Sequence, residues 1–223
     1  MGVIRAAVLF CLLLTVPAPA RAGAWPQEKG HWFASAAVQL IWPKRLEHRV
    51  STAPVSRYDM AYLEYGLTER WTLGGDIGRS VSGRDKTVIF LRHPIFPREQ
   101  GPKLAAELGF GKIDGLWVLR PGVSLGMGWS RGWLAADALA EVPLGGAALD
   151  TKLDVTFGLN LAEDRKLLVQ LQSGKHRRDE AFLRIAPSYV RPLTDRISAE
   201  FGATYGIVGD RGMGLKAGVW AKF

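Results

Sequence analysis

The residues that follow the first two dozen alternate between apolar and polar side chains with a period of two, which constrains this chain to strands. Between Asp150 and Leu161 one parity is apolar apart from Thr151, and the other is polar or glycine. Successive side chains of a strand point to opposite faces, so such a segment has one apolar and one polar face. We therefore expect an all-β protein. The same alternation recurs in Trp71–Gly78, Leu104–Gly111, Gly122–Trp129 and Ile197–Tyr205.

Glycine on the polar face favours a membrane barrel over a soluble sandwich. Many of the 26 glycines fall on the polar parity, and Gly75 alone falls clearly on the apolar one. Glycine offers nothing to solvent, but it suits strands that coil tightly around large inward side chains. An apolar outside with glycine and charge inside is typical of a transmembrane β-barrel. Aromatic rings settle at membrane interfaces, and six tryptophans near turns or termini fit that role: Trp25, Trp32, Trp71, Trp129, Trp133 and Trp220.

The first 22 residues are expected to be a cleaved secretory signal. Arg5 supplies the positive charge, Ala6–Val16 is an apolar run too short for a membrane anchor, and Ala20-Arg21-Ala22 is a small-x-small cleavage site. No later segment has 18 consecutive apolar residues, which excludes a helical membrane protein. The only cysteine, Cys11, lies within the signal, so no intrachain disulfide can form. Residues 23–223 are then expected to form one barrel in the bacterial outer membrane.

Turn signals divide this barrel into twelve strands, with both termini on the periplasmic side. Pro94 interrupts the strand near Thr87–Phe96, so ten strands is the alternative. The five short turns are expected at 67–70, 97–102, 130–132, 162–165 and 193–195. The six loops of the other end are expected at 43–56, 79–87, 112–116, 143–148, 174–180 and 207–212.

Two segments resemble small bacterial outer-membrane β-barrel proteins. Phe223 is the last residue, with Ala221, Val219 and Leu215 on its parity, although Trp220 lies on the opposite one. This resembles the terminal strand of bacterial outer-membrane barrels, which implies that the barrel-assembly machinery reads Phe223 during biogenesis. The hairpin at 62–75, together with the start Gly23-Ala-Trp-Pro26, is similar to a group of proteobacterial barrels without an assigned activity.

Continuing the parity along the chain assigns a set of charged side chains to the lumen. They are expected to pair across strands, because charges removed from bulk water need partners. The lumen is then either plugged by ion pairs or a narrow pore whose charges set ion selectivity. A pore predicts that alanine at Glu107 or Arg120 changes the selectivity. The predicted lumen charges are Glu64, Asp76, Arg92, Glu107, Arg120, Asp137, Glu141, Asp150, Lys152, Asp154, Arg184, Glu200 and Lys216.

The leading prediction for function is a structural or narrow pore-forming outer-membrane barrel. The alternatives are a barrel that contacts lipopolysaccharide, a lipid-modifying outer-membrane enzyme and a soluble periplasmic β-protein. Phosphate groups of lipopolysaccharide suit the basic loop side chains Lys175, Arg177 and Arg178, although ordinary solvated loops explain them equally well. Outer-membrane lipid and lipopolysaccharide are thus the expected partners, and nucleic acid is not expected in an exported chain.

The enzymatic alternative has no motif behind it. Ser80, Ser82, Asp85 and His176 fall in expected loops, but their spacing does not identify a Ser–His–acid site. No metal-ligand spacing, phosphate loop or dinucleotide motif is present, so we expect no enzyme, no cofactor and no metal.

Overall fold

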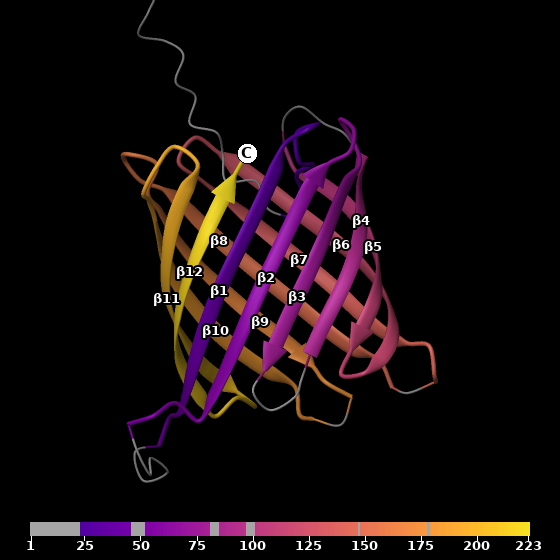
Figure 1. The fold of residues 1–223 in the computed structure, drawn as a ribbon, viewed down its shortest axis with the longest axis vertical. Helices are drawn as coiled ribbons and strands as arrows, with labels where there is room; N and C mark the ends of the chain where they lie inside the picture. Colours follow the sequence, from indigo (N-terminus) through magenta and orange to yellow (C-terminus); the bar gives the residue numbers. More distant parts are fainter. Residues whose placement is uncertain (1–22, 46–51, 81–84, 97–100, 147, 178) are drawn as a thin grey trace, which may run out of the picture.

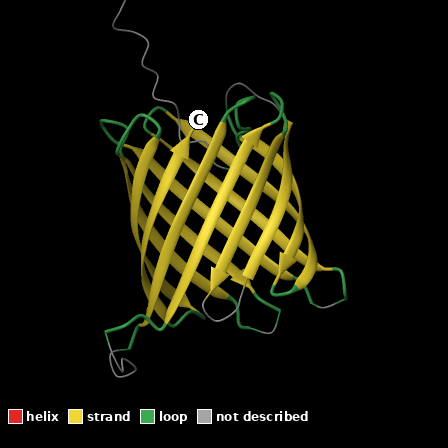
Figure 2. Ribbon diagram, viewed as in Figure 1, coloured by secondary structure: helices red, strands yellow, loops and turns green. Residues whose placement is uncertain are grey.

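Twelve antiparallel strands form one closed up-and-down barrel (Figures 1 and 2). This computed structural model describes residues 23–45, 52–80, 85–96, 101–146, 148–177 and 179–223, so the expected signal lies outside the described residues. The all-β class and the twelve strands are confirmed. The strands are β1 (Trp32–Pro43), β2 (Ser56–Gly66), β3 (Thr72–Ser80), β4 (Asp85–Phe96), β5 (Lys103–Ile113), β6 (Leu116–Trp129), β7 (Gly132–Pro143), β8 (Asp150–Asn160), β9 (Lys166–Lys175), β10 (Phe182–Pro192), β11 (Ile197–Val208) and β12 (Gly212–Lys222).

Each strand pairs with its neighbours in sequence, and β1 pairs with β12 to close the sheet. Phe33 lies opposite Lys222, and Phe223 and Trp32 exchange two backbone hydrogen bonds of 2.9 and 3.0 Å at the seam. The C-terminus therefore marks one end of the barrel, called here the terminal end, which also carries the five short turns (Figure 1). The other end, called the loop end, carries the six remaining connections. Among the described residues, no helix has the length and apolar character to cross a membrane.

Pro94 does not end its strand. β4 continues to Phe96, and its register against β5 shifts between Pro94 and Phe96. A proline lacks a backbone donor and is tolerated in sheets at such irregularities. The alternative with ten strands is therefore wrong.

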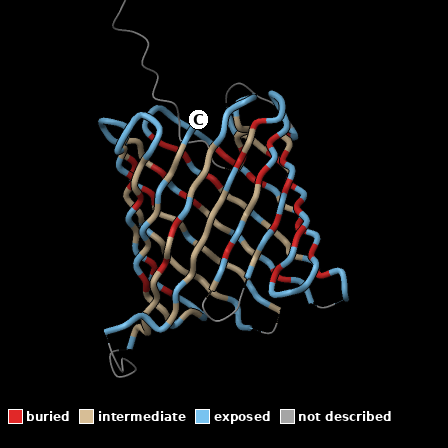
Figure 3. The backbone as a smooth tube through the Cα atoms, in the orientation of Figure 1, coloured by how far each residue is buried: buried red, intermediate tan, exposed pale blue. Residues whose placement is uncertain are grey.

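The outer surface of the barrel is apolar. Large apolar side chains are exposed along the strands, among them Ile89 (63 %), Leu108 (55 %) and Phe201 (61 %). In Figure 3 exposed positions alternate with buried or half-buried ones along the strands. This is the alternation read from the sequence, with the apolar parity outside. Such a surface suits lipid rather than water.

Glycines on the inner face make room for large rings. A Cβ atom on Gly74 would lie 2.0 Å from Phe90, and one on Gly158 would lie 2.2 Å from Trp133. Both rings are almost completely buried within the barrel. Inward glycine thus accommodates bulky inward neighbours on adjacent strands, as the sequence pattern indicated.

Half of the tryptophans expected at membrane interfaces face inward instead. Trp32, Trp71 and Trp129 are each 41 % exposed, which is consistent with the outer surface. Trp133 is 2 % exposed and forms an inner apolar cluster with Ala135, Leu168 and Val190. Trp25 and Trp220 pack against this cluster. Position near a turn does not fix parity, and parity decides which face a ring occupies.

Candidate functional site

The barrel encloses a cavity of about 2690 Å³, and all thirteen charged residues assigned to the lumen line it. They lie at inward positions on strands that surround the cavity, because the register keeps one parity of each strand inside. Among the described residues that line it, 14 are Asp or Glu and ten are Lys or Arg. The full chain carries a net charge of +8. The cavity is therefore acidic although the protein as a whole is basic.

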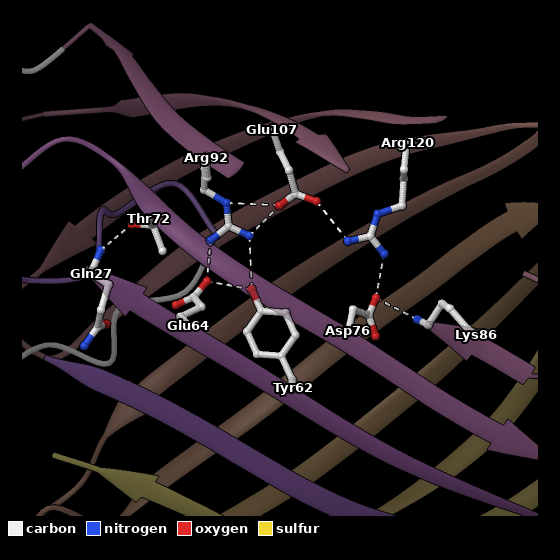
Figure 4. A network of polar contacts seen from close by, with 9 residues as sticks. All are labelled: Gln27, Tyr62, Glu64, Thr72, Asp76, Lys86, Arg92, Glu107 and Arg120. Atoms are coloured by element: carbon white, nitrogen blue, oxygen red, sulfur yellow. Dashed lines mark hydrogen bonds and ion pairs between the residues drawn. The ribbon is translucent and has the colours of Figure 1, made fainter. Parts of the chain in front are cut away.

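A row of alternating charges crosses the wall formed by β2 to β6 (Figure 4). Glu64 pairs with Arg92, whose Nε and Nη2 donate to Glu107 Oε2 over 3.2 and 2.7 Å. Arg120 Nη2 donates to Glu107 Oε1 over 3.0 Å, so Glu107 joins two guanidinium groups. The Glu107, Arg92 and Arg120 side chains are only 4, 6 and 2 % exposed. Glu107 is the centre of this row.

The row extends toward the loop end through Asp76. Its Oδ2 accepts from Arg120 Nη1 over 2.6 Å and from Lys86 Nζ over 2.7 Å. At the other end of the row, the Tyr62 hydroxyl donates to Glu64 over 2.6 Å and accepts from Arg92 over 3.1 Å. Three acids and three bases thus alternate, and the row is formally neutral. Such a network stiffens one wall of the cavity, although Arg120 Nε is buried in it without a hydrogen-bond partner.

The next two strands bring acids together. Asp137 on β7 lies directly opposite Asp154 on β8, and Glu141 lies opposite Asp150. Like charges directly opposite each other are destabilising unless cations compensate them. Lys152 Nζ lies 3.2 Å from Asp154 Oδ2, but Asp154 Oδ1 is buried without a hydrogen-bond partner. Among the strand side chains that line the cavity, the excess of acid is therefore concentrated on β7 and β8.

Ion pairs also hold β10, β11 and β12. Glu200 accepts from Lys216 over 2.8 Å and from the indole Nε1 of Trp220 over 2.9 Å. Arg184 donates to Asp210 over 2.6 Å at the loop end. The contact with Glu200 explains why Trp220 lies on the opposite parity to Phe223: its ring belongs to the lumen. Phe223 itself is 58 % exposed, and its recognition by the assembly machinery stays a prediction.

The basic loop residues do not form one outward patch. Arg177 is turned toward the cavity, where its backbone amide and Nε donate to Asp150 over 2.5 and 3.2 Å. Its guanidinium thus has a carboxylate partner in the cavity and does not point outward as expected. Lys175 is exposed, and Arg178 lies outside the described residues. Contact with lipopolysaccharide stays a prediction, which concerns Lys175 and the undescribed Arg178.

The structure describes three of the four loop residues considered for catalysis. Ser80, Asp85 and His176 line the cavity, and the His176 ring stacks on Phe182 with centroids 5.7 Å apart. Ser82 lies outside the described residues.

Sequence reasoning missed two parts of the site. The turn signals place Lys86 in a loop, whereas β4 begins at Asp85 and Lys86 shares the inward parity of Arg92. That shared parity was a usable signal. Residues 23–31 precede the first strand and enter the cavity, where Gly23, Gln27 and Glu28 line it. No periodic pattern marks such a segment.

Comparisons with known proteins identify the fold. A KdgM porin superposes with a TM-score of 0.64 at 8 % identity, covering 85 % of this chain and 99 % of that chain. A NanC porin superposes with a TM-score of 0.65 at 12 % sequence identity, covering 85 % of this chain and 100 % of that chain. An outer-membrane channel from Pseudomonas putida F1 superposes with a TM-score of 0.63 at 11 % sequence identity, covering 91 % of this chain and 99 % of that chain. No family model matches the chain, and no curated protein matches it. The chain thus has the fold of small outer-membrane porins.

Proposed function

We propose that this protein is a narrow outer-membrane channel that favours cations and neutral polar solutes over anions. The observation that carries the proposal is the cavity of about 2690 Å³ inside a closed barrel, lined in the described part of the chain by 14 acidic and ten basic side chains. The exposed apolar side chains of the strands support placement in a bilayer. Rings of charge in a water-filled lumen set selectivity by sign, and acidic rings favour cations.

On the strands of the wall, the excess of acid lies on β7 and β8, and this excess is the basis of the proposed selectivity. The row from Glu64 to Lys86 neutralises itself, whereas β7 and β8 carry Asp137, Glu141, Asp150 and Asp154 against Lys152 and Arg177 from the loop end. A permeating cation would meet this uncompensated charge. One structure with a similar fold is a KdgM porin in complex with a disordered oligogalacturonate. An acidic polymer of that kind would be repelled by the acidic wall of this cavity.

Ion permeability in a planar bilayer tests the proposal. We expect discrete conductance steps, and a reversal potential under a KCl gradient that shows preference for K⁺. Glu141→Gln should lower this preference, and Lys152→Gln should raise it, since the two residues lie on adjacent strands with opposite charge. The proposal is overturned if barrels whose β structure is verified by circular dichroism prefer Cl⁻, or if the wild type and both variants all fail to conduct.

A further inference from the structure

Residues 23–31 form a strap inside the terminal end of the barrel. The Gln27 amide donates to Thr72 Oγ1 over 2.9 Å, which fixes the strap to β3 (Figure 4). The Gly30 amide donates to Gly66 O over 2.8 Å, and the Gly66 amide donates to His31 O over 3.1 Å. Ala24, at the other end of the strap, is only 1 % exposed. The strap is therefore held on the wall of β2 and β3 and continues into the lumen.

The wall of β6 and β7 receives the other end of the strap. Trp25 lies over Gly126, where a Cβ atom would come within 2.5 Å of the indole ring. The same ring packs against the inner cluster around Trp133. Gly126 thus leaves a recess that this indole fills. The strap thus crosses from β2 and β3 to β6 and β7 at this end of the cavity.

The first residue of the strap rests on a carboxylate. A Cβ atom on Gly23 would lie 2.1 Å from Asp137 Oδ1, so the Gly23 backbone lies directly against that oxygen. Asp137 faces Asp154 across the β7–β8 pair, and Asp154 Oδ1 is buried without a hydrogen-bond partner. Lys152 is the cation in salt-bridge contact with this pair of acids among the described residues. One further positive charge at Gly23 would balance the two acids.

We propose that signal removal supplies this charge and thereby fixes the strap as a plug. Hydrolysis of the Ala22–Gly23 amide by a signal peptidase consumes one water, leaves a carboxylate on the released peptide and frees the amino group of Gly23. An α-amino group is largely protonated at neutral pH. The new ammonium group pairs with Asp137, and the uncleaved precursor lacks it. The plug rests on the proposed function, because it restricts the channel described above.

Labelling of the terminal amine tests the ion pair without reference to conductance. The mass of the protein purified from outer membranes should correspond to a chain that starts at Gly23. In the folded protein an N-hydroxysuccinimide ester should acylate this amine slowly. Asp137→Asn removes the partner charge and should accelerate acylation about tenfold, which is the size expected for loss of one charge-assisted hydrogen bond. Asp59→Asn, at an exposed surface pair, is the control and should leave the rate unchanged.

A second variant separates loss of the pair from misfolding. Trp25→Ala empties the recess at Gly126 without altering a strand, and it should also accelerate acylation. Both variants should raise the single-channel conductance over that of the wild type. A start other than Gly23, or equal acylation rates in all four proteins, overturns the ion pair. Faster acylation at unchanged conductance overturns the plug, whereas a complete lack of conductance with faster acylation overturns the proposed channel and leaves the ion pair standing.

Discussion

The charge row on β2 to β6 depends on Glu107. Loss of the Glu107 carboxylate should lower the free energy of unfolding more than loss of any surface ion pair does. Glu107→Gln keeps the shape and one acceptor oxygen but leaves Arg92 and Arg120 without their shared carboxylate. All three side chains are nearly inaccessible. Removing one member of a buried ion pair costs about 3–5 kcal/mol. We expect about 3 kcal/mol, or roughly a hundredfold in the unfolding equilibrium, because the amide still accepts one hydrogen bond.

Equilibrium unfolding in urea from lipid vesicles measures this loss. The eight tryptophans report the transition by fluorescence. Asp59→Asn is the matched control, since it breaks the Arg57–Asp59 pair of 2.8 Å, whose side chains are 52 and 42 % exposed. Exposed pairs contribute under about 1 kcal/mol. The reasoning fails if Glu107→Gln destabilises the barrel no more than Asp59→Asn does.

Three further outcomes are expected. Gly74→Ala should lower the free energy of unfolding by about 1–3 kcal/mol, because its Cβ would meet Phe90 at 2.0 Å; adding Phe90→Leu should recover part of the loss, and no recovery would contradict the steric explanation. Ile89→Arg should cost about 2 kcal/mol or more in lipid vesicles, and it should cost more than Leu144→Arg in an exposed connection at the loop end. Phe223→Ala should reduce the amount of barrel in outer-membrane fractions but shift the stability of refolded protein by under about 1 kcal/mol; equal amounts in the membrane would count against an assembly signal.

Local patterns were sufficient to predict the strands and their two faces. Alternation along Asp150–Leu161 is visible within one strand, and a barrel with one lipid face and one inner face requires it. The position of the connections followed from turn residues. Pro94 wrongly suggests an interrupted strand, because a register shift against β5 accommodates the proline within β4. Such a shift depends on the neighbouring strand, so a single strand does not reveal it.

Partners within the lumen depend on register between strands, which the sequence does not specify locally. Parity placed Glu107 inside, but not between Arg92 and Arg120. Arg177 turns inward because Asp150 lies at the adjacent strand end. Residues 23–31 carry no alternation, and their position follows from contacts with Gly66, Thr72 and β6 rather than from any pattern of their own.

Closure of the sheet has a consequence for synthesis of the chain. Eleven of the twelve strand pairings join neighbours in sequence, whereas the pairing of β1 with β12 joins Phe33 to Lys222. Until the last strand has been made, β1 and the newest strand both present unpaired backbone groups. Such edges recruit other strands and promote aggregation. A sheet that lacks β12 therefore keeps an unpaired edge at β1, so the barrel can close only when the residues of β12 are available.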